Sequence, residues 1–133
     1  MDLSEYQKEV LKNFKPRRQL SEHESALLDW TLGIAGEAGE IIDVIQHNIF
    51  HQQPMDKMEL AKEIGDCLWY LTALCEELEF SMSDCAELNI AKLRYRHGGT
   101  FSYERSAQKS STEKSFKDTQ EFADLKWRIE HGR

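Results

Sequence analysis

The sequence has little of what stabilises a secreted protein or anchors a protein in a membrane. Its 133 residues include three cysteines, Cys67, Cys75 and Cys85, which form no CxxC pair and leave an odd count. This usage favours reduced thiols in a cytosol over a disulfide framework. No apolar run approaches the roughly 20 residues of a membrane-spanning helix, and the amino terminus does not resemble a signal peptide. We therefore expect a cytoplasmic protein.

Positive charge is also scarce. Lysine and arginine number 17 against 24 aspartates and glutamates, which gives a formal net charge of −7. An acidic chain repels a nucleic-acid backbone, so we expect no duplex DNA or RNA partner. A single nucleotide held through a metal ion is still compatible with the negative charge of the chain. A hydrophobic content of 40% and a charged content of 31% are typical of a globular protein, and the length suits one domain.

Proline is rare, and strand-like alternation of useful length is absent, so the sequence predicts an all-α fold. Pro16 and Pro54 mark breaks between segments whose apolar residues recur at helical spacing. The predicted helices cover residues 3–14, 22–50, 55–79 and 83–96. Ser21 and Glu24 predict a capping box at the start of the second helix, and Ser83 is the expected N-cap of the fourth.

The composition changes after residue 96. Residues 97–115 are rich in serine, threonine and lysine and are typical of a polar loop. A weak last helix is predicted from Phe116, Phe122, Leu125, Trp127 and Ile129. We therefore divide the chain into a helical domain, residues 1–96, and a polar C-terminal arm, residues 97–133, which docks on the bundle or on a second subunit.

Two short acidic repeats stand out within the apolar helical segments. Glu37 and Glu40 form the first, and Glu63 and Asp66 form the second after 22 intervening residues. A spacing of three puts both acids of a repeat on one helix face, with about 5–6 Å between Cβ atoms. Two carboxylates about 5 Å apart repel by roughly 3 kcal/mol at an effective dielectric constant of 20. A divalent cation would compensate this charge, and carboxylate ligands favour Mg²⁺, with Mn²⁺ as a substitute.

Glycines accompany the first acidic repeat. Gly33, Gly36 and Gly39 each cost about 1 kcal/mol relative to alanine in a helix interior. Their clustering predicts close approach of another backbone or of a ligand, and a kink in the helix is the alternative.

The predicted helix over residues 83–96 carries a polar row. Asn89, Lys92 and Arg96 lie on one side of it, and the two cations suit a polyphosphate. A magnesium ion beside such a phosphate chain would polarise phosphorus and lower the pKa of an attacking water, while Lys92 and Arg96 would neutralise a leaving pyrophosphate.

These motifs together resemble the MazG-like, all-α nucleoside triphosphate pyrophosphohydrolases. The resemblance covers about residues 20–105 and rests on the glycine-flanked ExxE, the ExxD and the segment Asn89-Ile-Ala-Lys92-Leu. It implies a four-helix-bundle-type core that is completed by dimerisation, as a dimer or a dimer of dimers. It also implies Mg²⁺-dependent cleavage between the α and β phosphates of a (d)NTP, a hydrolysis of a phosphoric anhydride that gives a (d)NMP and pyrophosphate.

The resemblance also implies roles for individual residues. It makes Glu37, Glu40, Glu63 and Asp66 metal ligands, with Glu40 or Glu63 orienting the water as the catalytic residue. Asn89 and Lys92 would contact the substrate.

Two aromatic residues add to the candidate substrate site from their positions alone. Trp30, one turn before Gly33, would stack on a base, unless it is a core residue. Tyr70, one turn after Asp66, would bond a sugar or phosphate oxygen, unless it is an ordinary half-buried tyrosine.

Two other interpretations compete with a pyrophosphohydrolase that clears non-standard or surplus nucleotides. The first is a non-catalytic helical module that binds nucleotide or a partner protein and keeps the acids as a structural metal site. The second is a di-iron bundle, which the absence of Glu-x-x-His disfavours. Separately, His47 and His51 are four residues apart and could ligate a metal, but no third ligand is evident in the sequence.

Overall fold

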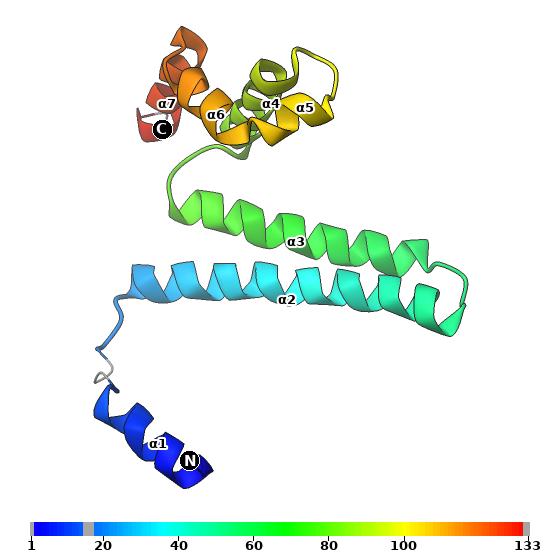
Figure 1. Cartoon of the computed structure of the whole chain (residues 1–133), viewed down its shortest axis with the longest axis vertical. Coiled ribbons are helices and arrows are strands. Elements are labelled where there is room, and N and C mark those ends of the chain that lie inside the picture. Colours follow the sequence, from blue (N-terminus) through cyan, green and yellow to red (C-terminus); the bar gives the residue numbers. More distant parts are fainter. Residues whose placement is uncertain (1, 15–17, 132–133) are drawn as a thin grey trace.

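The computed structural model describes residues 2–14 and 18–131, and every helix or strand within these ranges is an α-helix (Figure 1). The all-α prediction is therefore confirmed. In chain order the elements are α1 (Leu3–Lys12), α2 (Glu22–His51), α3 (Lys57–Glu77), α4 (Met82–His97), α5 (Tyr103–Ala107), α6 (Lys109–Lys117) and α7 (Gln120–His131). The break predicted at Pro16 lies outside the described residues. No helix in the described ranges is long and apolar enough to cross a lipid bilayer.

Helices α2 and α3 form a long antiparallel hairpin, which dominates the molecule (Figure 1). The predicted capping box is present, because Ser21 accepts from the backbone N–H of Glu24 and the Glu24 carboxylate accepts from the backbone N–H of Ser21. At the far end Gln52 takes a left-handed conformation, φ 52°, which ends α2 and turns the chain toward Asp56, the N-cap of α3. Local capping thus sets the length of both helices.

The glycine prediction is confirmed at one of its three positions. A Cβ atom added at Gly33 would lie 2.3 Å from Cε1 of Tyr70, so the tyrosine ring packs directly on the α2 backbone. At Gly36 and Gly39, in contrast, an added Cβ atom would meet nothing within 4 Å. Close helix contact therefore explains Gly33, while the other two glycines face open space in the single chain.

This difference gives a matched pair of substitutions. Gly33→Ala should lower the free energy of unfolding by about 1–3 kcal/mol, the usual cost of overpacking, because the Tyr70 ring is also held against Trp30 and Trp69. Gly36→Ala should raise it by up to about 1 kcal/mol through helix propensity. Urea unfolding of both variants measures the difference, and equal effects would contradict the packing role of Gly33.

Helix α4 begins earlier than the sequence predicts. Its N-cap is Ser81, whose hydroxyl accepts from the backbone N–H of Ser83 at 3.1 Å, so the prediction of Ser83 as the N-cap is wrong. Either serine satisfies the capping pattern, and the chain uses the first, since its backbone is extended while that of Ser83 is helical.

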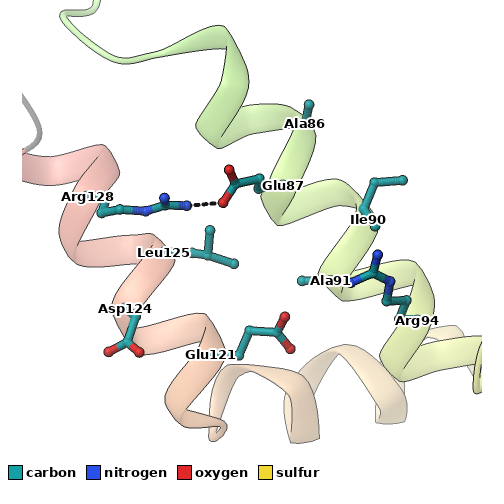
Figure 2. A pocket seen from close by; sticks show the side chains of 9 residues that line it. All are labelled: Ala86, Glu87, Ile90, Ala91, Arg94, Glu121, Asp124, Leu125 and Arg128. Atoms are coloured by element: carbon teal, nitrogen blue, oxygen red, sulfur yellow. Dashed lines mark hydrogen bonds and ion pairs between the residues drawn. The ribbon is translucent and has the colours of Figure 1, made fainter.

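The prediction of a polar loop over residues 97–115 is also wrong, because the structure contains α5 and α6 there. Helices α6 and α7 pack on α4, and their core consists of Ala91, Phe116 and Leu125. Figure 2 shows Leu125 of α7 pointing toward α4, with Arg128 reaching across to Glu87. Short helices of low propensity form only when an apolar contact stabilises them, and Phe116 supplies that contact for α6.

Much apolar surface stays uncovered. The apolar side chains of α1 are exposed, namely Leu3, Tyr6, Val10 and Leu11, and α1 has no buried residue. Each hairpin helix also carries an outward apolar row besides the one that packs between the helices. The outward residues are Leu28, Leu32, Ile42, Ile45 and Ile49 on α2 and Ile64, Leu68, Leu71 and Leu78 on α3. Exposed apolar surface of this extent is typical of faces that bind a partner or a ligand.

Candidate metal centre

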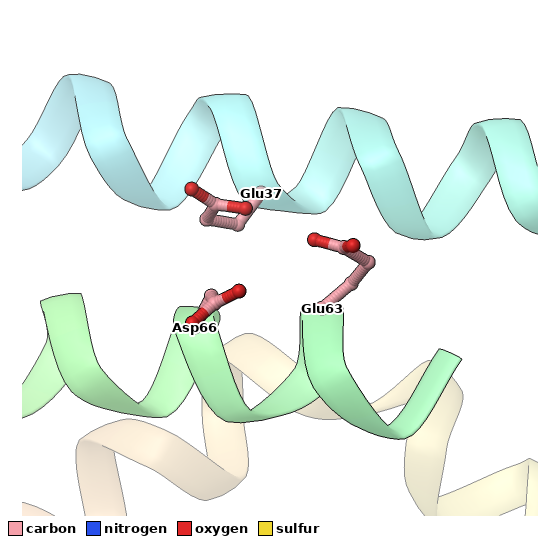
Figure 3. Close-up of side chains that lie close together, drawn as sticks. All are labelled: Glu37, Glu63 and Asp66. Carbon is pink, nitrogen blue, oxygen red and sulfur yellow. The ribbon is translucent and has the colours of Figure 1, made fainter. Parts of the chain in front are cut away.

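Packing of the hairpin brings acids of both repeats together. Glu37 of α2 and Glu63 and Asp66 of α3 point into the space between the two helices (Figure 3). One carboxylate oxygen from each lies within 4.8 Å of the others. Glu63 is 5% exposed, Glu37 is half-buried and Asp66 faces solvent. The cluster is therefore anchored by a buried carboxylate and is open at one side.

The electrostatics of the cluster match its geometry. The pKa of Glu37 is raised, first by burial, then by its contact with Glu63 and by the negative charges of Asp66, Glu63 and Glu40. The nearest cation is Lys62, whose Nζ lies 3.1 Å from Glu63 and 2.5 Å from Glu59. These two acids raise the pKa of Lys62, with Glu59 the larger cause. One exposed lysine shared with Glu59 leaves the cluster with an excess of negative charge.

The donor set fits a hard divalent cation. All three ligands are carboxylates, and neither histidine nor cysteine takes part in the cluster. Mg²⁺ and Mn²⁺ prefer such oxygen donors, whereas zinc and copper sites use nitrogen or sulfur. Three carboxylates also leave coordination positions for waters or for phosphate oxygens of a ligand.

Glu40, the fourth predicted ligand, is placed differently. It is exposed on α2, one turn beyond Glu37, and does not belong to the group of three acids with mutually close oxygens. It remains close enough for its charge to raise the pKa of Glu37. Its predicted roles as a ligand and as a catalytic residue stay predictions.

The predicted polar row of α4 faces the C-terminal helices. Asn89 and Lys92 line a hollow together with residues of α6 and α7. Arg96 forms an ion pair with Glu113 of α6, and its side chain is only 10% exposed. The sequence predicts this row near the acidic metal site, whereas in the folded chain α6 and α7 border it. Its predicted contact with substrate stays a prediction.

Aromatic residues fill the hairpin next to the cluster. The rings of Trp30 and Tyr70 lie 6.4 Å apart, between centroids, and meet across the two helices. Trp69 packs edge-on against Trp30 with 5.7 Å between ring centroids, yet it is 58% exposed. Trp30 and Tyr70 thus have packing roles, and the role of either in binding substrate stays a prediction.

Two features of the site were missed from the sequence. Lys62, which precedes Glu63 directly, is the neighbouring cation, and an acid–lysine–acid pattern at Glu59, Lys62 and Glu63 was available as a signal. Lys117 lies in the same hollow as Lys92, at the end of α6. Most of α6 was expected to be a loop, and only a weak last helix was predicted from Phe116 onward, so no strong periodic pattern indicated this lysine.

The raised pKa of Glu37 predicts how the metal-free protein responds to pH. Since the folded pKa lies above the ordinary value of 4.5, the contribution of Glu37 to stability is complete below pH 4.5 and is lost as the pH rises through the folded pKa. Mg²⁺ should restore stability toward neutral pH, and its affinity should increase over the same range because binding displaces the proton. Urea unfolding with EDTA or with Mg²⁺, from pH 4.5 to neutrality, measures both effects.

Glu37→Gln is the control for this pH effect. The variant lacks the titrating group, so its metal-free stability should change less between pH 4.5 and neutrality than that of the unaltered chain. An identical pH dependence in the two proteins would refute the assignment to Glu37.

Known proteins share this part of the chain. The family model of the MazG nucleotide pyrophosphohydrolase domain matches residues 25–101, which contain the whole acidic cluster and most of α2, with α3 and α4. The chain is also similar to the Gene 37 protein of Mycobacterium phage L5, with 32% identity over 72 residues, or 50% of this chain and 61% of that protein. It thus spans less than two thirds of that relative's length. No solved structure shows significant similarity.

Proposed function

Because the chain belongs to the MazG nucleotide pyrophosphohydrolase domain family, we propose that it hydrolyses nucleoside triphosphates to nucleoside monophosphates and pyrophosphate with Mg²⁺. The observation that carries this proposal is the convergence of Glu37, Glu63 and Asp66 from two separate helices on one small volume. Mn²⁺ is expected to replace Mg²⁺, because it takes the same oxygen donors. Clearance of non-standard or surplus nucleotides in a cytoplasm is the role we propose for this activity.

The three acids have different environments and therefore different proposed roles. Glu63 is buried and held by Lys62, so it is the rigid ligand that positions the ion. Asp66 is exposed, so we assign it to the side of the ion that substrate phosphates would reach. When bound, Mg²⁺ lowers the pKa of an attacking water and draws charge from the phosphates. Glu40 or Glu63 would orient that water, and the exposed position of Glu40 leaves it free to do so.

A panel of ribonucleoside and deoxyribonucleoside triphosphates tests the activity. The chain is incubated with each nucleotide and Mg²⁺, and the products are separated. We expect monophosphate and pyrophosphate in equal amounts, with no product when EDTA replaces Mg²⁺. Nucleotide binding without turnover would instead support a non-catalytic module with a structural metal site. Release of inorganic phosphate without pyrophosphate would contradict the position of cleavage.

We propose further that two copies of the hairpin form the four-helix core. Two helices cannot cover their own outward faces, and in the described hairpin only Glu63 and Cys75 are buried. The outward rows of α2 and α3 would pack on those of a second copy, as in a helical bundle. Gly39, where an added Cβ atom meets nothing, would allow that copy to approach closely.

A further inference from the structure

A second candidate metal site lies at the carboxyl-terminal end of α2, away from the acidic cluster. The rings of His47 and His51 lie 4.8 Å apart, between centroids, on one side of the helix. Asp43, one turn before His47, lines the same hollow of about 250 Å³ as the two histidines. Ten residues, or about 15 Å of helix, separate His47 from Glu37, so this group is distinct from the acidic cluster.

The ring nitrogens of this histidine pair are free to bind a ligand. In the described part of the chain, neither imidazole has a hydrogen-bond or ion-pair partner. The other three histidines each have a partner, namely Glu77 for His23, Ser102 for His97 and Trp127 for His131. Two adjacent imidazoles whose nitrogens are uncommitted can both accept a metal ion.

The surroundings of the pair favour a cation. Both histidines lie in the last two turns of α2, near the negative end of the helix dipole. The residues that line their hollow include the carboxylate of Asp43 and neither lysine nor arginine. A neighbouring hollow of about 320 Å³ joins Asp43 and His47 to Asp56 and Glu59 near the start of α3, again without a lysine or arginine in its lining. With the histidines neutral, both hollows therefore carry negative charge.

We propose that His47, His51 and Asp43 form a site for Zn²⁺ or another transition-metal ion that imidazole binds. Two histidines four residues apart on one helix face can hold a single zinc ion, and imidazole nitrogens suit zinc, nickel and copper, whereas Mg²⁺ prefers oxygen. Asp43 would be the third ligand, and water would complete the coordination. This site would thus take a different class of metal from the carboxylate cluster.

Binding at this site needs only rotation of side chains. In the structure the ligand atoms of Asp43, His47 and His51 do not all lie within 4.8 Å of one another, as those of the acidic cluster do. All three side chains are exposed, and exposed side chains exchange rotamers rapidly. The three residues lie on the opposite side of α2 from the outward row, which includes Ile45 and Ile49, so the proposed dimer leaves them accessible.

Calorimetric titration with Zn²⁺ tests the proposal, in saturating Mg²⁺ that competes for the carboxylate cluster. We expect the unaltered chain to bind Zn²⁺, and His47→Ala or His51→Ala to weaken that binding by about 10-fold or more, because each removes a nitrogen ligand. His23→Ala is the matched control, since His23 is an exposed histidine on the same helix and lies outside the site. No binding of Zn²⁺ by the unaltered chain, or equal affinity in all three variants, would overturn the proposal.

Two further variants separate this site from the carboxylate cluster. Asp43→Asn should weaken Zn²⁺ binding, but less than the loss of a histidine, because the two nitrogen ligands remain. Glu63→Gln should leave the affinity for Zn²⁺ unchanged, since Glu63 belongs to the other group. Loss of Zn²⁺ binding in Glu63→Gln, together with normal binding in His47→Ala, would place the ion in the carboxylate cluster and refute the histidine site.

Nuclear magnetic resonance with Ni²⁺ locates the ion directly. Paramagnetic Ni²⁺ broadens the signals of nearby protons, so a small amount should broaden the imidazole signals of His47 and His51 before those of His23, His97 and His131. Equal broadening of all five histidines would refute a specific site. Neither experiment measures nucleotide turnover, so a failure of the proposed pyrophosphohydrolase activity would leave this site standing, and the absence of metal binding here would leave that activity standing.

Discussion

Glu63→Gln is expected to reduce pyrophosphate release by at least about 100-fold while the helical content stays unchanged. The substitution removes a charge from the centre of the cluster but keeps the size of the side chain. Glu63 is the buried member of the three acids, and its oxygen lies within 4.8 Å of the ligand oxygens of Glu37 and Asp66. Without its charge the remaining two carboxylates would bind Mg²⁺ more weakly. Initial rates at saturating Mg²⁺ and circular dichroism measure the two quantities.

Glu59→Gln is the matched control for this experiment. Glu59 lies on the same helix and pairs with the same Lys62, but it does not belong to the cluster. We expect its rate to stay within a few-fold of that of the unaltered protein, since an exposed ion pair contributes little. A similar loss in both variants would indicate a general charge effect, and near-normal activity of Glu63→Gln would refute the site.

Leu68→Lys is expected to convert the proposed dimer into a monomer. Leu68 is 53% exposed and lies in the middle of the outward row of α3, between Ile64 and Leu71. A lysine there would place two like charges in an apolar interface, where desolvation opposes association. Sedimentation velocity measures the oligomeric state, and thermal unfolding of the unaltered chain should depend on its concentration.

Met58→Lys provides the comparison for the interface. Met58 is 81% exposed on the same helix but lies outside the outward row of α3, so the variant should remain a dimer. If the unaltered chain sediments as a monomer at all concentrations, or if Leu68→Lys stays dimeric, then the outward rows do not form the interface.

The first helices and the acidic repeats could be predicted from the sequence because the signals for them are local. Ser21 and Glu24 cap α2 through neighbouring backbone groups, and the spacing of Glu37 and Glu63 in apolar helices places both toward the packed side. Carboxylate ligands in the absence of histidine in turn indicate the class of metal.

The other parts of the site depend on contacts between distant segments. Periodicity places Glu40 on the same side of α2 as Glu37, but it does not show which α2 acid the carboxylates of α3 approach. In the folded chain Glu37 joins the α3 acids, and Glu40, the fourth predicted ligand, lies outside the group of three close carboxylates. Likewise, the segment that contains Lys117 lacks a strong helical pattern, and Phe116 makes it helical only by packing against α4.

By itself, then, the sequence determined an all-helical chain with two acidic repeats suited to a hard cation, because capping, periodicity and ligand type act over one or two helix turns. Only the tertiary structure decided that three of the four acids meet, that Asn89 and Lys92 face the C-terminal helices and that Arg96 pairs with Glu113. The physical reason is that helical spacing defines the face on which a side chain lies, while the packing of the helices defines what that face meets.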